Sequence, residues 1–187
     1  EPRLVSMATA SLRTFAPPLP PGGSATGDPV RRAAAQRLVD FMRSRGEVPD
    51  EDLFAAAEAL RATGAAGAAL PLLQELLVRA PDRADLLFAE AEVLLALPRE
   101  AAQEQARLTR ALSTYQRFLA GREYSTDPQV RDALCWHCQW RQLECLDRAG
   151  TDRARFAARI ERLRALDPSL GGELFSARVR ALLERPE

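Results

Sequence analysis

The sequence predicts an all-helical protein built from antiparallel helix pairs. Its 187 residues are 47% hydrophobic but only 6% aromatic, so alanine and leucine must fill the core. Both residues are strong helix formers. Ile160 is the only isoleucine and valine is sparse, which disfavours a β-sheet. Short breaks marked by Gly or Pro separate the helical patterns, and short connections make neighbouring helices antiparallel.

Two regions are expected: an extended tail over residues 1–28 and a helical repeat domain over residues 29–187. The tail scatters a few hydrophobic residues through a polar stretch and then reads Ala-Pro-Pro-Leu-Pro-Pro-Gly-Gly at 16–23. Such composition favours extended or polyproline conformation. The tail is therefore interpreted as a linker, or as a segment that docks the domain onto a larger complex.

The first helix is predicted to begin at Asp28-Pro29 and to end near Gly46. Asp can cap a first turn, and Pro fits the first helical position. The hydrophobic side chains that recur on one face of this helix, and that we expect to pack on the core, are Val30, Ala34, Leu38, Phe41 and Met42.

The remaining helices follow at short intervals. They are predicted near residues 51–63, 67–79, 83–96, 98–120, 128–149, 152–166 and 171–184. Pro71 is placed within the first turn or so of the second of these, where a missing N–H costs little. The helix that starts near Pro98 is expected to be about two turns longer than a standard helix of such a repeat.

A repeat of 34 residues is visible in the first half of the chain. Residues 50–83 form one unit, with Gly64 at its turn and Pro81 at its end. Five residues of this unit recur unchanged 34 positions later: Leu53 as Leu87, Phe54 as Phe88, Ala57 as Ala91, Glu58 as Glu92 and Leu60 as Leu94. Small residues such as Ala57 and Ala69 allow two helices to approach closely.

This unit resembles the tetratricopeptide repeat, a 34-residue helical hairpin. The resemblance weakens along the chain. In the second unit, Ala111, Tyr115 and Phe118 fit the pattern of the second helix but come eight residues later than their counterparts in the first unit. In the third unit, the spacing of the second helix is kept by Phe156, Ile160, Leu163 and Pro168. The resemblance implies an α-solenoid of about three hairpins with an extra N-terminal helix and a C-terminal capping helix. In this family the first helices of the hairpins line a concave groove that binds ligands.

One aromatic residue and one carboxylate recur four residues apart on the predicted first helices. Residues with this spacing share a helical face. The three pairs, predicted to bind a partner, are Phe54 with Glu58, Phe88 with Glu92, and Trp140 with Glu144. An aromatic column beside an acidic one suits a segment with apolar and basic side chains. The alternative is that the aromatic residues pack between repeats and the glutamates pair with nearby arginines.

Charge argues against a nucleic-acid partner and against an anionic membrane surface. The 26 basic residues are all arginine, 26 acidic residues balance them, and the chain has no lysine or asparagine. That bias is typical of a GC-rich bacterial genome. The arginine run over residues 153–164 is interrupted by Glu161 and is read as a solvated helix face. No apolar run approaches the roughly 18 residues that a membrane span needs.

Three cysteines favour a reducing compartment, and a cytoplasmic location is expected over a periplasmic one. Cys135-Trp136-His137-Cys138 resembles a metal or redox motif, and a metal- or redox-responsive protein that uses Cys135 and Cys138 is kept as the alternative function. With a single histidine and only Cys145 nearby, core packing is the preferred reading. Glu100 and Glu104 share a helical face but lack the Glu-x-x-His partner of a di-metal site.

No catalytic constellation, resident metal or cofactor is predicted. The main expectation is therefore a non-enzymatic interaction module, an adaptor or a subunit of a larger bacterial assembly. Its partner is expected to be a protein or peptide with basic and apolar side chains, bound in the groove, docked through the tail, or both.

Overall fold

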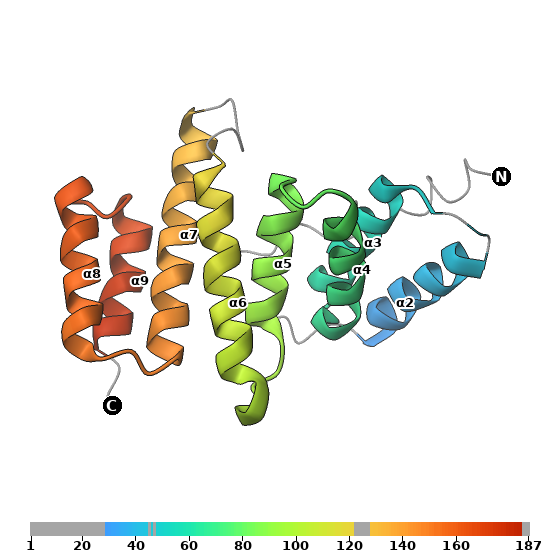
Figure 1. Cartoon of the computed structure of the whole chain (residues 1–187), viewed down its shortest axis with the longest axis horizontal. Helices are drawn as coiled ribbons and strands as arrows, with labels where there is room; N and C mark the ends of the chain where they lie inside the picture. The colour runs from blue at the N-terminus through green and yellow to red at the C-terminus, as the bar shows by residue number, and fades with distance from the viewer. Residues whose placement is uncertain (1–28, 45, 47, 122–127, 185–187) are drawn as a thin grey trace. The chain divides into compact units, whose positions relative to one another are not determined.

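The computed structural model describes residues 29–44, 46, 48–121 and 128–184, and its regular secondary structure there is entirely helical (Figure 1). The all-α prediction is confirmed, while the predicted tail over residues 1–28 lies outside the described residues. The helices are α2 Pro29–Ser44, α3 Asp50–Ala62, α4 Ala66–Arg79, α5 Ala84–Ala96, α6 Ala101–Ala120, α7 Pro128–Arg148, α8 Arg153–Leu166 and α9 Glu173–Leu183.

The chain divides into two compact units, residues 1–98 and residues 99–187, which are called unit 1 and unit 2 below. In unit 1, α3 and α4 pack as an antiparallel hairpin, α5 packs on α4, and α2 packs on α3. The buried core of unit 1 draws its leucines and alanines from these helices. Ala57 of α3 and Ala69 of α4 are both fully buried, as expected for small residues that let paired helices approach.

The 34-residue period is visible in the helices of unit 1. Helices α3 and α5 each have 13 residues, and both their first and last residues are 34 positions apart. The equivalent side chains are also buried alike: Leu53, Ala57 and Leu60 in the first helix, and Leu87, Ala91 and Leu94 in the other. Equal spans and the shared burial of these three positions mean that the sequence repeat corresponds to a repeated helix in unit 1.

The predicted buried face of α2 is partly wrong. Val30 is 73% exposed and Phe41 is 44% exposed, whereas Val39 and Met42 are buried. Val39 and Met42 lie 34 residues before Leu73 and Leu76, two of the three buried leucines of α4. Helix α2 therefore shares two buried positions with α4 at this spacing, whereas Leu38, 34 residues before the third leucine, Leu72, is only half-buried.

Two predictions about helix ends have different outcomes. Helix α6 has 20 residues against 14 in α4, so the expected lengthening is confirmed. Pro71, however, is the sixth residue of α4 and lies in its second turn. Its missing N–H leaves the carbonyl of Gly67 without the usual helical donor, and both residues are exposed on a side that water can reach.

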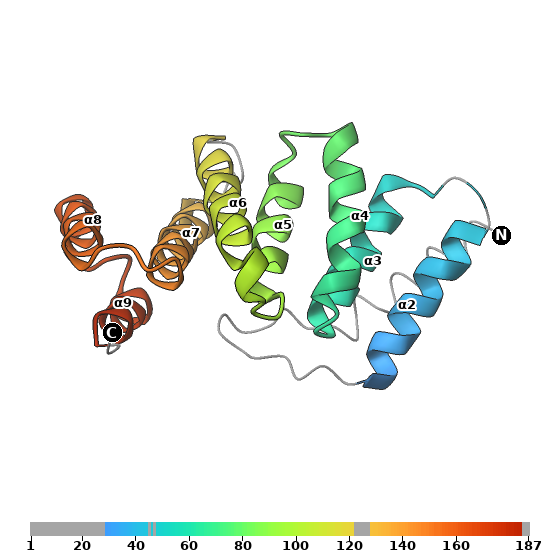
Figure 2. The ribbon, with the colours of Figure 1, turned by 60° about the horizontal axis from the view of Figure 1, so that its bottom comes forward.

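Unit 2 contains α6 packed on α7, and a second core shared by α7, α8 and α9. Figure 2 shows α7, α8 and α9 at the corners of a triangle. Phe156, Ile160 and Leu163 of α8 are buried in that core, as the repeat pattern predicted. Between α6 and α7, Arg148 donates to Glu104 at 2.6 Å, so Glu104 forms an interhelical ion pair.

The turn after α7 matches the turn after α3. Gly64 and Gly150 both have positive φ, +75° and +67°, which glycine adopts without strain. In each turn the residue after the glycine donates its N–H to a leucine carbonyl five residues earlier: Ala65 to Leu60 at 2.8 Å and Thr151 to Leu146 at 3.0 Å. This is the Schellman pattern of a helix C-terminus. Gly150 thus has the same place and geometry after α7 as Gly64 has after α3.

Candidate functional site

The predicted partner-binding pairs lie on α3, α5 and α7. The first two pairs belong to unit 1, whereas Trp140 and Glu144 belong to unit 2. Phe54 and Trp140 each precede their turn glycine by ten residues, and Glu58 and Glu144 precede it by six. The pairs on α3 and α7 therefore occupy equivalent positions relative to equivalent turns.

Phe54 is half-buried against the core of unit 1, and a guanidinium group lies over its ring. This group belongs to Arg83, the residue just before α5, and its Cζ atom is 5.5 Å from the Phe54 ring centroid. A cation over an aromatic face is attracted by the negative face of the ring. The structure thus shows that this ring accepts a guanidinium group.

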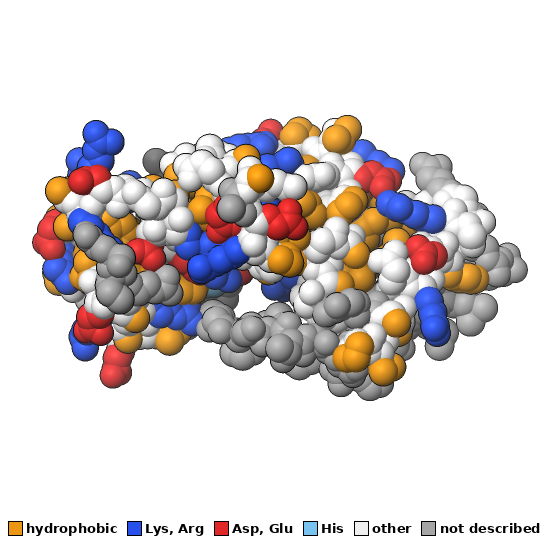
Figure 3. All heavy atoms as spheres, turned by 90° about the horizontal axis from the view of Figure 1, so that it is seen from below, with side chains coloured by type: hydrophobic (Ala, Val, Ile, Leu, Met, Phe, Trp, Pro, Cys, Tyr) orange, Lys and Arg blue, Asp and Glu red, His pale blue; other side chains and the backbone are white. Residues whose placement is uncertain are grey.

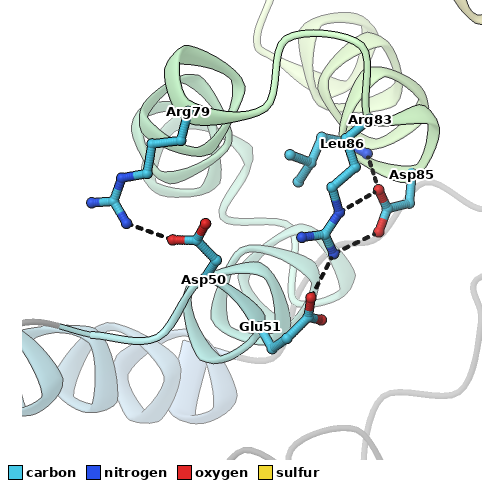
Figure 4. Close-up of polar contacts among 6 residues, drawn as sticks. All are labelled: Asp50, Glu51, Arg79, Arg83, Asp85 and Leu86. Atoms are coloured by element: carbon cyan, nitrogen blue, oxygen red, sulfur yellow. Dashed lines mark hydrogen bonds and ion pairs between the residues drawn. The ribbon is translucent and has the colours of Figure 1, made fainter.

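Arg83 is held by carboxylates from two helices (Figure 4). It donates to both oxygens of Asp85 at 2.9 Å and pairs with Glu51 of α3 at 3.0 Å. The hydrogen bond to Asp85 is the main reason that the pKa of Arg83 is raised further above its ordinary value. Figure 4 also shows the ion pair of Asp50 with Arg79, so the beginning of α3 is tied to both α4 and α5.

The Glu58 carboxylate is paired within its own helix. Arg61, three residues later, donates to both Glu58 oxygens at 2.9 and 2.8 Å. The Glu58 side chain remains 33% exposed, so it can still accept a further donor from outside. An exposed helical pair of this kind contributes only a few tenths of a kcal/mol, roughly 0.3–0.5.

Phe88 is half-buried, and Glu92 is only 8% exposed. The repeat places Phe88 where Phe54 stands, and their exposure class is the same. Glu92 differs from its counterpart Glu58, since most of its side chain is inside the protein. Within unit 1, the accessible carboxylate of the predicted surface is therefore Glu58 of α3, while Phe54 and Phe88 are half-buried alike.

Trp140 lies between arginines of two helices in unit 2. The Cζ atom of Arg141 is 4.7 Å from the ring centroid, and that of Arg178 of α9 is 4.4 Å away. Arg141 also donates to Glu144 at 2.7 Å, so this carboxylate is paired within its helix as Glu58 is. His137 approaches Trp140 edge-on, with 5.6 Å between the ring centroids.

Three arginines contact these rings that the repeat pattern does not indicate: Arg83, Arg141 and Arg178. Arg141 neighbours Trp140 in the sequence, whereas Arg83 and Arg178 reach the rings from other segments of the chain.

The zero net charge of the chain hides a charge asymmetry. Residues 48–98 have a formal charge of −6, because they contain only Arg61, Arg79 and Arg83 against nine acidic residues.

The cysteine motif lies on α7. Cys138 and Cys145 are buried, Cys135 is half-buried, and none of the three is in a disulfide. Among the described residues, no group of three or more His, Cys, Asp or Glu side chains could hold a metal ion. Burial of Cys138 and Cys145 agrees with the predicted packing role.

The arginine run on α8 is partly engaged in contacts within unit 2. Arg153 pairs with Asp147 at 3.3 Å, and Arg159 donates to Gln139 and Gln142 at 3.2 and 3.1 Å. On the face drawn in Figure 3, arginine side chains are interspersed with carboxylates and hydrophobic groups. That face carries no continuous basic field.

None of the helices in the described ranges is both long and apolar enough to cross a membrane. Comparison with protein-family models, with curated proteins and with solved structures found no significant match.

Proposed function

We propose that this chain is a non-enzymatic, tetratricopeptide-like module that binds another protein through the α3 and α5 face of unit 1. The observation that carries the proposal is the repetition of α3 by α5: the two helices have equal length, three equivalent buried positions and a half-buried phenylalanine at the same place. The turn shared by α3 and α7 supports an extension of the same plan into unit 2. In repeat arrays of this kind, stacking of hairpins creates an extended binding surface.

The surface on α3 supports binding of basic and apolar side chains. Phe54 offers a half-buried ring, while Glu51, 70% exposed, and Glu58 offer carboxylates beside it. Because residues 48–98 have a formal charge of −6 while the rest of the chain is net positive, a basic partner segment would be attracted to this part of unit 1.

The proposal is tested by affinity capture from cells that produce the protein, with Glu58→Arg as the test variant. Glu161→Arg is a matched control, because Glu161 also pairs with an arginine three residues later but lies on α8. A partner captured by the wild type and by the control variant, but lost with Glu58→Arg, is the expected result. Equal capture by all three proteins would contradict the proposed surface.

A second variant tests the tail. Deletion of residues 1–28 is expected to leave the Glu58-dependent partner bound. Loss of every partner on this deletion alone would mean that the chain is attached to its complex through the tail, with the α3 aromatic serving in packing.

A further inference from the structure

Helix α8 repeats α4 at a spacing of 87 residues. Both helices have 14 residues, and both their first and last residues are 87 positions apart. The buried positions match as well: Ala69, Leu73 and Leu76 of α4 correspond to Phe156, Ile160 and Leu163 of α8. Every residue of α8 can therefore be compared with a counterpart in α4.

One side of α8 differs in charge from the same side of α4. It is formed by four residues at the spacing i, i+4, i+7 and i+11, which places them in one row along the helix. This row is called the arginine stripe: Arg155, Arg159, Arg162 and Leu166. The counterparts in α4 are Ala68, Leu72, Glu75 and Arg79. An arginine of α8 thus stands where α4 has an alanine, a leucine or a glutamate.

In unit 1 the equivalent stripe of α4 makes contacts with neighbouring helices. Leu72 is buried in the core of unit 1, and Glu75 pairs with Arg43 of α2 at 3.5 Å. Arg79 pairs with Asp50 of α3. On this side of α4, ion pairs therefore join the helix to its neighbours, and the carboxylate of the stripe meets an arginine of another helix.

The arginine stripe of α8 is open to solvent. Arg155 and Arg162 are exposed, Leu166 is 79% exposed, and Arg159 is half-buried. Arg159 donates to the side-chain amide oxygens of two glutamines of α7, at 3.2 and 3.1 Å. Those oxygens are neutral, so Arg159 keeps its full charge. Within the part of the chain that the structure describes, no carboxylate forms an ion pair with any of these three arginines.

We propose that the arginine stripe binds an acidic helix of a partner protein, at a surface separate from the α3 and α5 face. Three uncompensated cations in a row attract and orient a row of carboxylates. Their spacing alternates between four and three residues, which is the spacing at which two helices laid side by side meet. The partner helix is expected to carry carboxylates at that spacing and an apolar residue at the end that meets Leu166.

A protein helix fits this surface better than a nucleic acid does. Leu166 offers an apolar contact at one end, and the stripe contains no aromatic side chain on which a base could stack. Helix α8 has a formal charge of +4, from five arginines and one glutamate, but the whole chain is neutral. Tight binding of nucleic acid usually neutralises more phosphates than three arginines can.

The probe is a labelled helical peptide of alanine and glutamine that carries three glutamates and a leucine at the spacing of the stripe. A second version with the leucine first allows for the opposite helix direction, and a control peptide distributes the same residues around the helix. Fluorescence anisotropy with the full chain at physiological salt is expected to show saturable binding of one stripe peptide, about tenfold or more tighter than the control peptide.

Two protein variants locate the binding. Arg162→Glu is expected to weaken binding of the stripe peptide by about tenfold, because it turns an attraction into a repulsion. Arg164→Glu is the matched control: it makes the same charge change on an exposed residue of α8, but Arg164 lies about 140° or more around the helix from every member of the stripe. It is expected to leave the preference for the stripe peptide unchanged, as is Glu58→Arg on α3.

Several results would overturn the inference. These are equal binding of the stripe and control peptides, and equal losses with Arg162→Glu and Arg164→Glu. A DNA duplex that binds more tightly than the peptide and depends on Arg162 would assign the stripe to nucleic acid. Self-association in sedimentation experiments that is lost with Arg162→Glu would assign it to a second copy of the chain. Circular dichroism of every variant distinguishes lost binding from unfolding.

Discussion

Gly171 lies against the Trp136 indole at the beginning of the α9 segment. Its φ is +80°, and a Cβ atom there would be 2.2 Å from Trp136 Cγ. Gly172, with φ +101°, has open space around the equivalent position. Gly171→Ala therefore combines a left-handed backbone with a collision that the ring can relieve only by moving.

We expect Gly171→Ala to destabilise unit 2 by roughly 2–4 kcal/mol and Gly172→Ala by only about 1–2 kcal/mol. The measurement is urea unfolding followed by tryptophan fluorescence, since both tryptophans are in α7. Equal losses for the two variants would mean that the contact with Trp136 contributes nothing beyond backbone strain.

Asp167 organises the same turn. Its carboxylate accepts from the Ser169 hydroxyl at 2.7 Å, from the Ser169 N–H at 2.8 Å and from the Gly171 N–H at 2.9 Å. These bonds, that of the Ser169 hydroxyl first, hold the pKa of Asp167 below its ordinary 3.8. The contribution to stability is then present above pH 3.8 and is lost as the pH falls through the lowered folded value.

Asp167→Asn is expected to remove part of the acid sensitivity of unit 2. Thermal unfolding midpoints measured from pH 6 down to pH 2 should fall less steeply for the variant than for the wild type below about pH 4. Parallel curves over that range would contradict a role for ionised Asp167.

At the scale of the helix, the close contact of α3 with α4 depends on Ala57. Ala57→Leu adds three carbon atoms where no space is left, since Ala57 is fully buried. We expect a loss of about 1–3 kcal/mol in the free energy of unfolding. Ala96→Leu, at the exposed last residue of α5, is the control and should stay within about 0.5 kcal/mol. Chemical denaturation measures both, and an unaffected Ala57→Leu would mean that the helices can separate without cost.

Sequence periodicity located the helices well because alanine, leucine, glycine and proline give strong local signals. The 34-residue match between α3 and α5 was readable for the same reason. The face of α2 was not, because Val30 and Phe41 are large and regularly spaced yet stay largely exposed, while Val39 and Met42 are buried in the core of unit 1. Local spacing cannot decide which of two apolar stripes is buried.

The candidate site was only partly readable from sequence. The aromatic and acidic positions follow from the repeat, but the contacts of Phe54 with Arg83 and of Trp140 with Arg178 join distant segments. The burial of Glu92 was also hidden, because its counterpart Glu58 is accessible. Tertiary packing, which a repeat alignment does not contain, decides these points.

At the scale of the whole molecule, a zero net charge conceals an acidic segment between basic ones. Some carboxylates of residues 48–98 lie in the first turn of a helix, where they interact favourably with the positive end of the helix dipole. They are Asp50, Glu51 and Asp52 in α3, and Asp85 in α5. Arg83 pairs with Glu51 in the first turn of α3 and with Asp85 in the first turn of α5, so it joins the beginnings of these two helices. The same charges would accelerate the encounter with a basic partner.

The claim that α3 carries the partner-binding face is tested most directly by photo-crosslinking in cells. A photoreactive amino acid at position 51, beside Phe54 and 70% exposed, is compared with one at position 161 on α8. A crosslinked protein partner from position 51 but not from position 161 is the result expected here. Crosslinking only from position 161, or from neither position, would contradict the assignment of the α3 face.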